Sequence, residues 1–413
     1  MIIHFWSLPE NRNYITLKEE LKKKIIKELK NKKYSWKLIN RMENKKISIQ
    51  KIKAISKKED FSLSLIEENI LWIGGNNSRG LSNPKFPINF RTRNGARFIA
   101  AIVNDGTLTK ESKNGHGKLM YDNFDESLRN SVMQDYMTIF GGNKNEIAFR
   151  NTEKKKYLEF SSVIRDIVEL VIKDKGPKCE SNILLPSFIL KDKETMAGWI
   201  EQTIADEGEV KHYPTKSYAD RYRRAIIWRR SLDVTNTFNK KINKTIAFGK
   251  LSLSTQKILL KLRCNLIESE KEILRLMGVN YSLYNLGIYP TIKNKIRTRW
   301  QIGITKRENL LKLRKLIKIP SVSKDKKFKA IVKEFVRYKE PLKIKEAILN
   351  LGENGKLFTS LDLVRKMNYK QTNTAIKWIK TFEKQNLIRK AKESSYGNGK
   401  YRQPAVYELI QDK

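Results

Sequence analysis

Two segments of the chain share one pattern of apolar and polar positions. Residues 97–108, RFIAAIVNDGTL, and residues 198–210, GWIEQTIADEGEV, each hold an apolar run at helical spacing, then an acid, a glycine and a strand-like start. The acids are Asp105 and Glu207. They stand roughly 100 positions apart, about the length of one small domain. The pattern predicts two related halves, each bringing one carboxylate to the end of a helix.

The segments after each glycine also follow one plan. Each half is predicted to run helix, two strands, helix, one or two strands, helix, in an α+β fold. The halves are placed at 86–193 and 194–332. In the first, strand signals cover 107–109, 118–123 and 156–162, and helix signals cover 125–141 and 163–176. In the second, strands are signalled at 209–213, 224–232 and 296–305, a helix at 307–317, and an extra helical segment at 236–286.

The N-terminal residues 1–85 are predicted to form a helical module. Apolar positions recur at helical spacing in 16–30, 34–42 and 48–58, and the third segment is basic. Three short helices of this kind resemble a helix-turn-helix unit, although a plain helical bundle with a solvated lysine face fits the same pattern. The turn-rich stretch 74–87, GGNNSRGLSNPKFP, is predicted to be a linker.

The C-terminal residues 333–413 are predicted to form a winged helix. Helical patterns at 341–352, 360–367 and 370–386 precede two strand signals, 387–393 and 401–409, that flank a turn. In such a unit the third helix enters the major groove, which here would present Gln371, Asn373 and Lys377. Winged helices also bind proteins, so a protein-contact role is the alternative.

The charge balance points to a polyanionic partner. The chain holds 85 Lys and Arg against 44 Asp and Glu, for a net charge of +41. Within 296–305, Arg297, Arg299 and Gln301 alternate with apolar residues, which predicts a sheet with a basic front and an apolar back. We expect that front, with Arg229 and Arg230 of the strand signal 224–232, to contact double-stranded DNA. An ordinary solvated sheet face is the alternative.

Other features narrow the class of protein. No run of 18 apolar residues predicts a membrane span, and the first residues do not resemble a secretory signal. Only Cys179 and Cys264, with three histidines, are present, so a disulfide framework or a structural zinc site is not expected. We expect a cytoplasmic, nucleoid-associated monomer.

The repeated ending suggests a metal site. The last turn of a helix carries partial negative charge, so a carboxylate there is favoured when it binds a cation. The glycine would let the chain leave the helix through a left-handed turn. If the two helices pack side by side, Asp105 and Glu207 meet and can hold Mg²⁺ or Mn²⁺ next to a scissile phosphate. The alternative is that both acid–glycine pairs are plain helix caps.

These residues resemble the LAGLIDADG homing endonucleases. FIAAIVNDG (98–106) and IEQTIADEG (200–208) are similar to the nine-residue motif, with Asp105 and Glu207 at the metal-binding positions, followed by Gly106 and Gly208. The resemblance covers about 88–329. It implies two αββαββα halves related by a pseudo-two-fold axis, a saddle of sheets that grips the major groove, and Mg²⁺-dependent cleavage of both strands.

The chain also departs from that family. The family prefers Gly or Ala where the motif helices touch, whereas Gln202 stands there in the second motif, so Gly198 is expected to carry the close approach instead. Lys178 and Lys324 are the candidates for the basic residues that stabilise charge at the phosphate. The expected activity is site-specific double-strand DNA cleavage by a phosphodiester hydrolase. A non-cutting DNA-binding regulator and an RNA maturase on the same fold are the alternatives.

Overall fold

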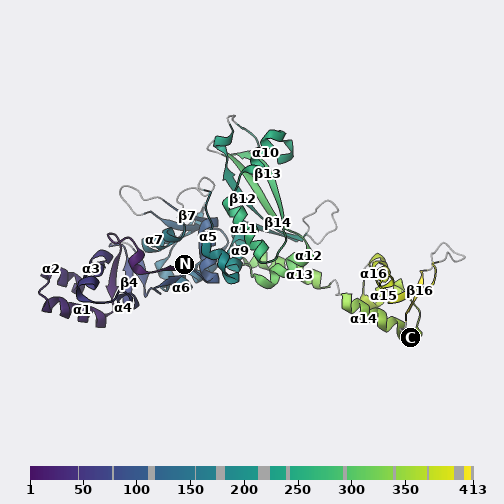
Figure 1. The fold of residues 1–413 in the computed structure, drawn as a ribbon, viewed down its shortest axis with the longest axis horizontal. Helices are drawn as coiled ribbons and strands as arrows, with labels where there is room; N and C mark the ends of the chain where they lie inside the picture. The colour runs from purple at the N-terminus through teal and green to yellow at the C-terminus, as the bar shows by residue number, and fades with distance from the viewer. Residues whose placement is uncertain are drawn as a thin grey trace. The chain divides into compact units, whose positions relative to one another are not determined.

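The computed structural model describes most of the chain, in two compact units (Figure 1). The described residues are 1–413 except 45, 77–78, 110–116, 154, 174–181, 213–223, 239–241, 292–294, 338–340, 370–371, 395–403 and 411–413. The units are Met1–Ile331 and Val332–Lys413. Helices and antiparallel sheets occur in both, so the fold belongs to the α+β class. None of the helices in these ranges combines the length and apolarity needed to span a bilayer.

The N-terminal module is not wholly helical, contrary to the prediction. Its helices are α1 (Glu19–Asn31), α2 (Trp36–Asn44), α3 (Ile49–Glu59) and α4 (Leu63–Glu68). They accompany an antiparallel sheet in the order β3 (Ile47–Ser48), β2 (Tyr14–Leu17), β4 (Ile70–Gly74), β5 (Gly80–Ser82). Ile15 and Leu17 are buried while their neighbours are half-buried, a period of two that marks a strand. Strands β4 and β5 also occupy part of the expected linker.

This module is attached to the first half by a buried acid. Arg12 Nη2 lies 2.7 Å from Asp166 Oδ1, and Asn13 Nδ2 donates to Asp166 Oδ2 at 2.9 Å. Asp166 belongs to α7 (Ser162–Val171). Short strands β1 (Ile2–Ile3) and β6 (Ile88–Asn89) also pair across the junction. The module and the first half are therefore parts of one compact unit.

The first half runs from a helix into a four-stranded antiparallel sheet. Its remaining elements are α5 (Arg93–Asn104), β7 (Gly106–Leu108), β8 (Leu119–Asp122), α6 (Glu126–Phe140), β9 (Ala148–Thr152) and β10 (Lys155–Phe160), before α7. The strand order is β7-β8-β10-β9. Leu119, Tyr121, Leu158 and Phe160 are buried on one side of this sheet. This buried side of the sheet is therefore part of the hydrophobic core of the first half.

The second half repeats this strand order. Its elements are α9 (Lys193–Glu207), β11 (Gly208–His212), β12 (Arg224–Asp233), α10 (Leu253–Lys261), α11 (Asn265–Leu276), β13 (Ser282–Pro290), β14 (Ile296–Ile304), α12 (Arg307–Leu316) and α13 (Val322–Arg337). The sheet order is β11-β12-β14-β13, so both sheets place their first, second, fourth and third strands side by side. The extra segment is not wholly helical as expected. Residues 282–286 begin β13, because they pair with β14.

The C-terminal unit holds three helices and a three-stranded sheet. These are α14 (Pro341–Gly352), β15 (Phe358–Thr359), α15 (Ser360–Met367), α16 (Thr372–Lys384), β16 (Ile388–Lys392) and β17 (Val406–Leu409), with strand order β15-β17-β16. Its own apolar core includes Phe358, Leu363 and Ile379. The short strand β15 was not predicted. Gln371 lies outside the described residues, and so does the expected turn at 394–400 except for its first residue.

Candidate active site

The two motif helices, α5 and α9, pack against each other at the centre of the first unit. The helices approach each other tightly at Gly198, where an added Cβ would lie 2.3 Å from the Arg93 carbonyl oxygen. This contact confirms the expectation that Gly198 permits the close approach. Arg93 also pairs with Glu201 through its Nη2 at 2.5 Å, so the same end of the interface is closed by an ion pair.

Gln202 is fully buried, despite its size and polarity. Its Nε2 lies 2.9 Å from Asp206 Oδ1, one turn along the same helix. Asp206 also accepts a hydrogen bond from the Tyr121 hydroxyl, at 2.7 Å. Gln202 Oε1 has no hydrogen-bond partner within the part of the chain that the structure describes. The polar residue that departs from the family pattern thus has a local partner, the Asp206 carboxylate.

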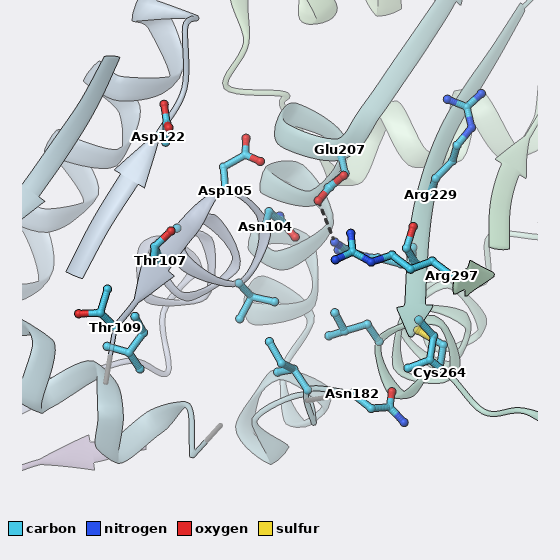
Figure 2. A pocket seen from close by; sticks show the side chains of 18 residues that line it. Asn104, Asp105, Thr107, Thr109, Asp122, Asn182, Glu207, Arg229, Cys264 and Arg297 are labelled. Atoms are coloured by element: carbon cyan, nitrogen blue, oxygen red, sulfur yellow. Dashed lines mark ion pairs between the residues drawn. The ribbon is translucent and has the colours of Figure 1, made fainter. Parts of the chain in front are cut away.

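The helix ends open into one cleft of about 720 Å³. Asp105 and Glu207 both line it, as do Asp122 of β8 and Arg229 and Arg297 of the second sheet. Figure 2 shows Asp105 and Glu207 projecting from the ends of α5 and α9. The Glu207 side chain is 36% exposed, so solvent and small ions reach it. The two acids singled out by the sequence therefore share one accessible site.

The glycines after the acids do not act as expected. Neither Gly106 nor Gly208 has the left-handed conformation, and Gly208 has φ −90°. An added Cβ would instead lie 2.6 Å from the Ile102 carbonyl oxygen at Gly106 and 2.4 Å from that of Ile204 at Gly208. Glycine is needed because each strand leaves tightly against the last helical turn. Both residues stand beside the acids and offer only backbone atoms to a ligand.

The surroundings of Asp105 are rich in acid. Asn123 Nδ2 donates to Asp105 Oδ2 at 2.8 Å. Asp206 is near enough that burial, together with the Asp105 carboxylate, raises the Asp206 pKa to about 8. The sequence did not single out Asp206, although it directly precedes the motif acid. The raised pKa means that the Asp206 carboxyl favours its neutral form at this place, chiefly because it is buried and also because Asp105 is near.

Glu207 lies beside a buried arginine. Arg230 Nη1 is 3.7 Å from Glu207 Oε1, the ion pair drawn dashed in Figure 2. The second amino group of the same guanidinium, Nη2, lies 2.5 Å from Glu270 Oε1. Trp228 Nε1 donates to Glu270 Oε2 at 2.8 Å. Arg230 is only 5% exposed. The expected DNA contact is contradicted for this residue, because its buried guanidinium is held between Glu270, inside the protein, and Glu207, at the cleft.

Lys324, one of the two basic residues that the resemblance singled out, lies beside the end of α9. Its Nζ donates to the carbonyl oxygens of Ala205 at 2.5 Å and Ile204 at 3.3 Å, at the end of α9. Burial lowers the Lys324 pKa, and the nearby acids Asp206 and Asp105 oppose that shift. The ammonium group is thus held close to the acidic helix ends. Lys178, the other candidate, lies outside the described residues.

The front of the second sheet carries most of the expected DNA-contact residues. Arg297 and Arg299 are half-buried, and Arg299 stacks over the Tyr289 ring at 4.5 Å. Arg229 Nε donates to Gln301 Oε1 at 3.0 Å. Gln301 is buried with that oxygen occupied, which contradicts its expected contact with DNA.

In the C-terminal unit, the described candidates lie on α16. Asn373 and Lys377 are both exposed, one turn apart. They therefore remain available to a partner, as expected.

The donors at the helix ends suit a hard cation. Asp105 and Glu207 line the cleft and supply carboxylate oxygens, which Mg²⁺ and Mn²⁺ favour. No cluster of three or more His, Cys, Asp or Glu residues suited to a metal occurs among the described residues. Two carboxylates fit an ion that keeps water or phosphate ligands, and do not fit a fully protein-coordinated structural site.

Comparison with known proteins gives a limited result. No protein-family model matches the chain, and no curated protein matches it. Among solved structures, the chain is similar to the N-terminal LAGLIDADG domain of DUF199/WhiA, with 12% identity, a TM-score of 0.26, and coverage of 56% of this chain and 86% of that one. It is also similar to the homing endonuclease I-WcaI bound to its DNA recognition sequence, with 11% identity, a TM-score of 0.29, and coverage of 58% and 87%.

Proposed function

We propose that the chain is a metal-dependent DNA endonuclease of the LAGLIDADG homing type. The observation that carries this proposal is the shared cleft, where the acids at the ends of two packed helices face the basic strands of a sheet. The equal strand order of the two sheets supports a pseudo-two-fold arrangement of the halves. The net charge of +41 supports duplex DNA as the partner.

In this proposal Asp105 and Glu207 hold Mg²⁺ or Mn²⁺ and bring it to the phosphate. When bound, such an ion activates water and stabilises the charge that develops on oxygen. In hydrolysis the water oxygen bonds to phosphorus, one phosphorus–oxygen ester bond breaks, and the leaving oxygen takes up a proton. Asn123 orients the Asp105 carboxylate through its hydrogen bond. The Lys324 ammonium, next to the acids, stabilises the negative charge of the phosphate.

The remaining basic side chains position the duplex. Arg229, Arg297 and Arg299 lie on the front of the second sheet, where they can contact phosphate oxygens. The C-terminal unit, with three helices and a small sheet, fits a winged helix that presents α16 to the major groove. We therefore assign cleavage to the paired halves and added sequence selection to the C-terminal unit, in a monomeric protein.

A non-cutting DNA-binding regulator is the second candidate. It is favoured by the Arg230–Glu207 ion pair, which places a positive charge where a cation is required. The acids retained at both helix ends favour the endonuclease, since a regulator does not need two carboxylates in a cleft that would receive phosphate.

Cleavage of a randomised duplex library with Mg²⁺ tests the proposal, using the variants Asp105→Asn and Glu207→Gln as matched controls. Each keeps the shape of the side chain and removes its charge, and a neutral amide is a poor ligand for Mg²⁺. We expect the unsubstituted chain to cut both strands and each variant to lose double-strand cleavage while still shifting DNA in a gel. Binding by the unsubstituted chain without any cut would favour the regulator. Cleavage that persists in both variants would reject these acids.

A further inference from the structure

The strand registers identify equivalent positions in the two halves. Gly106 of β7 pairs with Tyr121 of β8, and Gly208 of β11 pairs with Trp228 of β12. Each glycine directly follows its motif acid, so Tyr121 and Trp228 occupy the same place relative to the two acids. Counting onward from these partners therefore matches residues of the two halves without any comparison of their side chains.

Two residues beyond these partners, each half holds the side chain that contacts its own acid. Asn123 occupies this position in the first half and donates to Asp105 at 2.8 Å. Arg230 occupies it in the second half, 3.7 Å from Glu207. The same backbone position thus supplies a neutral hydrogen-bond donor to one acid and a positive charge to the other.

One residue beyond the same partners, the charges are opposite. Asp122 occupies this position in the first half and Arg229 in the second, and both line the cleft. Arg229 Nη2 also lies 3.8 Å from Glu209. At this position the first half therefore brings a further carboxylate into the cleft, whereas the second half brings a guanidinium group.

We propose that the two acids bind divalent cations unequally, with the Asp105 side tight and the Glu207 side weak. This inference rests on the proposed function of the cleft. A cation that binds Glu207 must compete with Arg230, and Arg230 cannot swing away because Glu270 holds its other end inside the protein. A cation at Asp105 meets, at the equivalent position, the neutral amide of Asn123 and not a guanidinium group. When the concentration of the divalent cation is limiting, the DNA strand whose phosphate lies at Asp105 is cut first. The product is then a duplex with a nick in that strand.

The test measures Mn²⁺ binding to the full-length chain without DNA, by the loss of the free-ion signal in electron paramagnetic resonance. The variants Asp105→Asn and Glu207→Gln each leave one motif acid and serve as controls for each other. We expect Glu207→Gln to retain the tight site, and Asp105→Asn to retain only a site that is about tenfold weaker, as one nearby charge at this range allows. Equal affinities in the two variants, the reverse order, or no bound Mn²⁺ would overturn the proposal.

A second pair of variants separates the arginine from general effects on folding. The double change Arg230→Gln with Glu270→Gln removes both charges of the buried pair, so neither is left unpaired. We expect it to tighten the weak site about tenfold. The control is Arg275→Gln with Glu272→Gln, an exposed ion pair on the same helix as Glu270, at 2.6 Å. The control should leave both affinities unchanged, and an unchanged weak site in the Arg230 double variant would overturn the proposal.

Cleavage of a target duplex distinguishes this inference from the proposed function. Unequal Mn²⁺ sites in a chain that never cuts DNA would reject the endonuclease and keep the inference. Double-strand cutting with equal Mn²⁺ sites would reject the inference alone. Accumulation of a nick in one defined strand at low Mg²⁺, abolished by Asp105→Asn, is the result expected if both hold.

Discussion

Single side chains decide the chemistry of the cleft, and Lys324 shows how finely they are placed. Its ammonium group bonds the last carbonyls of α9, where the helix already concentrates partial negative charge. Burial lowers the pKa of this lysine from the ordinary value of 10.5, while the carboxylates around it raise that pKa. The positive charge of Lys324 is therefore lost at a lower pH than that of a surface lysine.

We expect Lys324→Met to reduce the cleavage rate by about a hundredfold, the usual effect of removing one charge-stabilising donor. In the unsubstituted chain, the Lys324 contribution should decline as pH rises through the lowered pKa, below 10.5. Single-turnover cleavage measured from neutral to alkaline pH checks both points. Lys327→Met, at an exposed position of the same helix, should cleave normally. An unaltered rate and pH profile in Lys324→Met would exclude the lysine from the mechanism.

Several of these residue contacts could not be predicted from the sequence. The paired acids were found because each ends an apolar helical run, a local signal. Asn123, Asp206 and Arg230 were missed or misassigned because their partners depend on strand register and helix packing. Arg230 looks like a surface arginine in the sequence, and only its buried partner Glu270, 40 positions away, shows otherwise.

At the scale of elements, the strongest periodic signals were the most reliable. Helix α16 lies close to its predicted range, and α5 and α9 end at or beside the predicted acids, although both begin before the predicted patterns at 97 and 198. Strands β2 and β15 were missed, since each has only two to four residues and continues almost directly into a helix. A period of two is hard to recognise over so short a span, so the sheet of the N-terminal module was not predicted.

We expect Gly198→Ala to lower the free energy of unfolding by about 1–3 kcal/mol, as overpacking of a tight interface commonly does. The added methyl group would lie 2.3 Å from the Arg93 carbonyl oxygen, and backbone there cannot move without shifting α5. Gly249→Ala is the matched control, because an added Cβ at Gly249 meets no atom within 4 Å. Urea denaturation of both variants measures the difference. Equal stability of the two would show that the helices can separate at no cost.

At the scale of the whole molecule, charge dominates recognition. The net charge of +41 predicts duplex binding whose affinity falls steeply as salt is raised, because bound counterions are released from the phosphates. Arg299→Ala should weaken binding and make the salt dependence shallower by about one ion. Gel-shift titrations across a series of salt concentrations provide the measurement. Affinity that is insensitive to salt would contradict an interface built from phosphate contacts.

The division into two compact units gives a further test. We expect a chain ending at Arg337, which keeps the whole of α13, to fold and to cut DNA with Mg²⁺ but with relaxed sequence preference. The lost unit carries the exposed Asn373 and Lys377 and none of the residues that line the cleft. Sequencing of cut sites from a randomised library compares the two chains. Unchanged selectivity would assign the C-terminal unit to protein contacts.

The contact between Gly198 and the Arg93 carbonyl oxygen has a consequence for how such a protein can change. Backbone meets backbone there, so no exchange of side chains can bring the two helices closer together. The distance between the helix axes is therefore fixed by the fold. It sets the spacing between the two phosphates that the proposed endonuclease reaches. New target sequences can be acquired only on the strands and the outer units, while the offset between the two cuts stays constant.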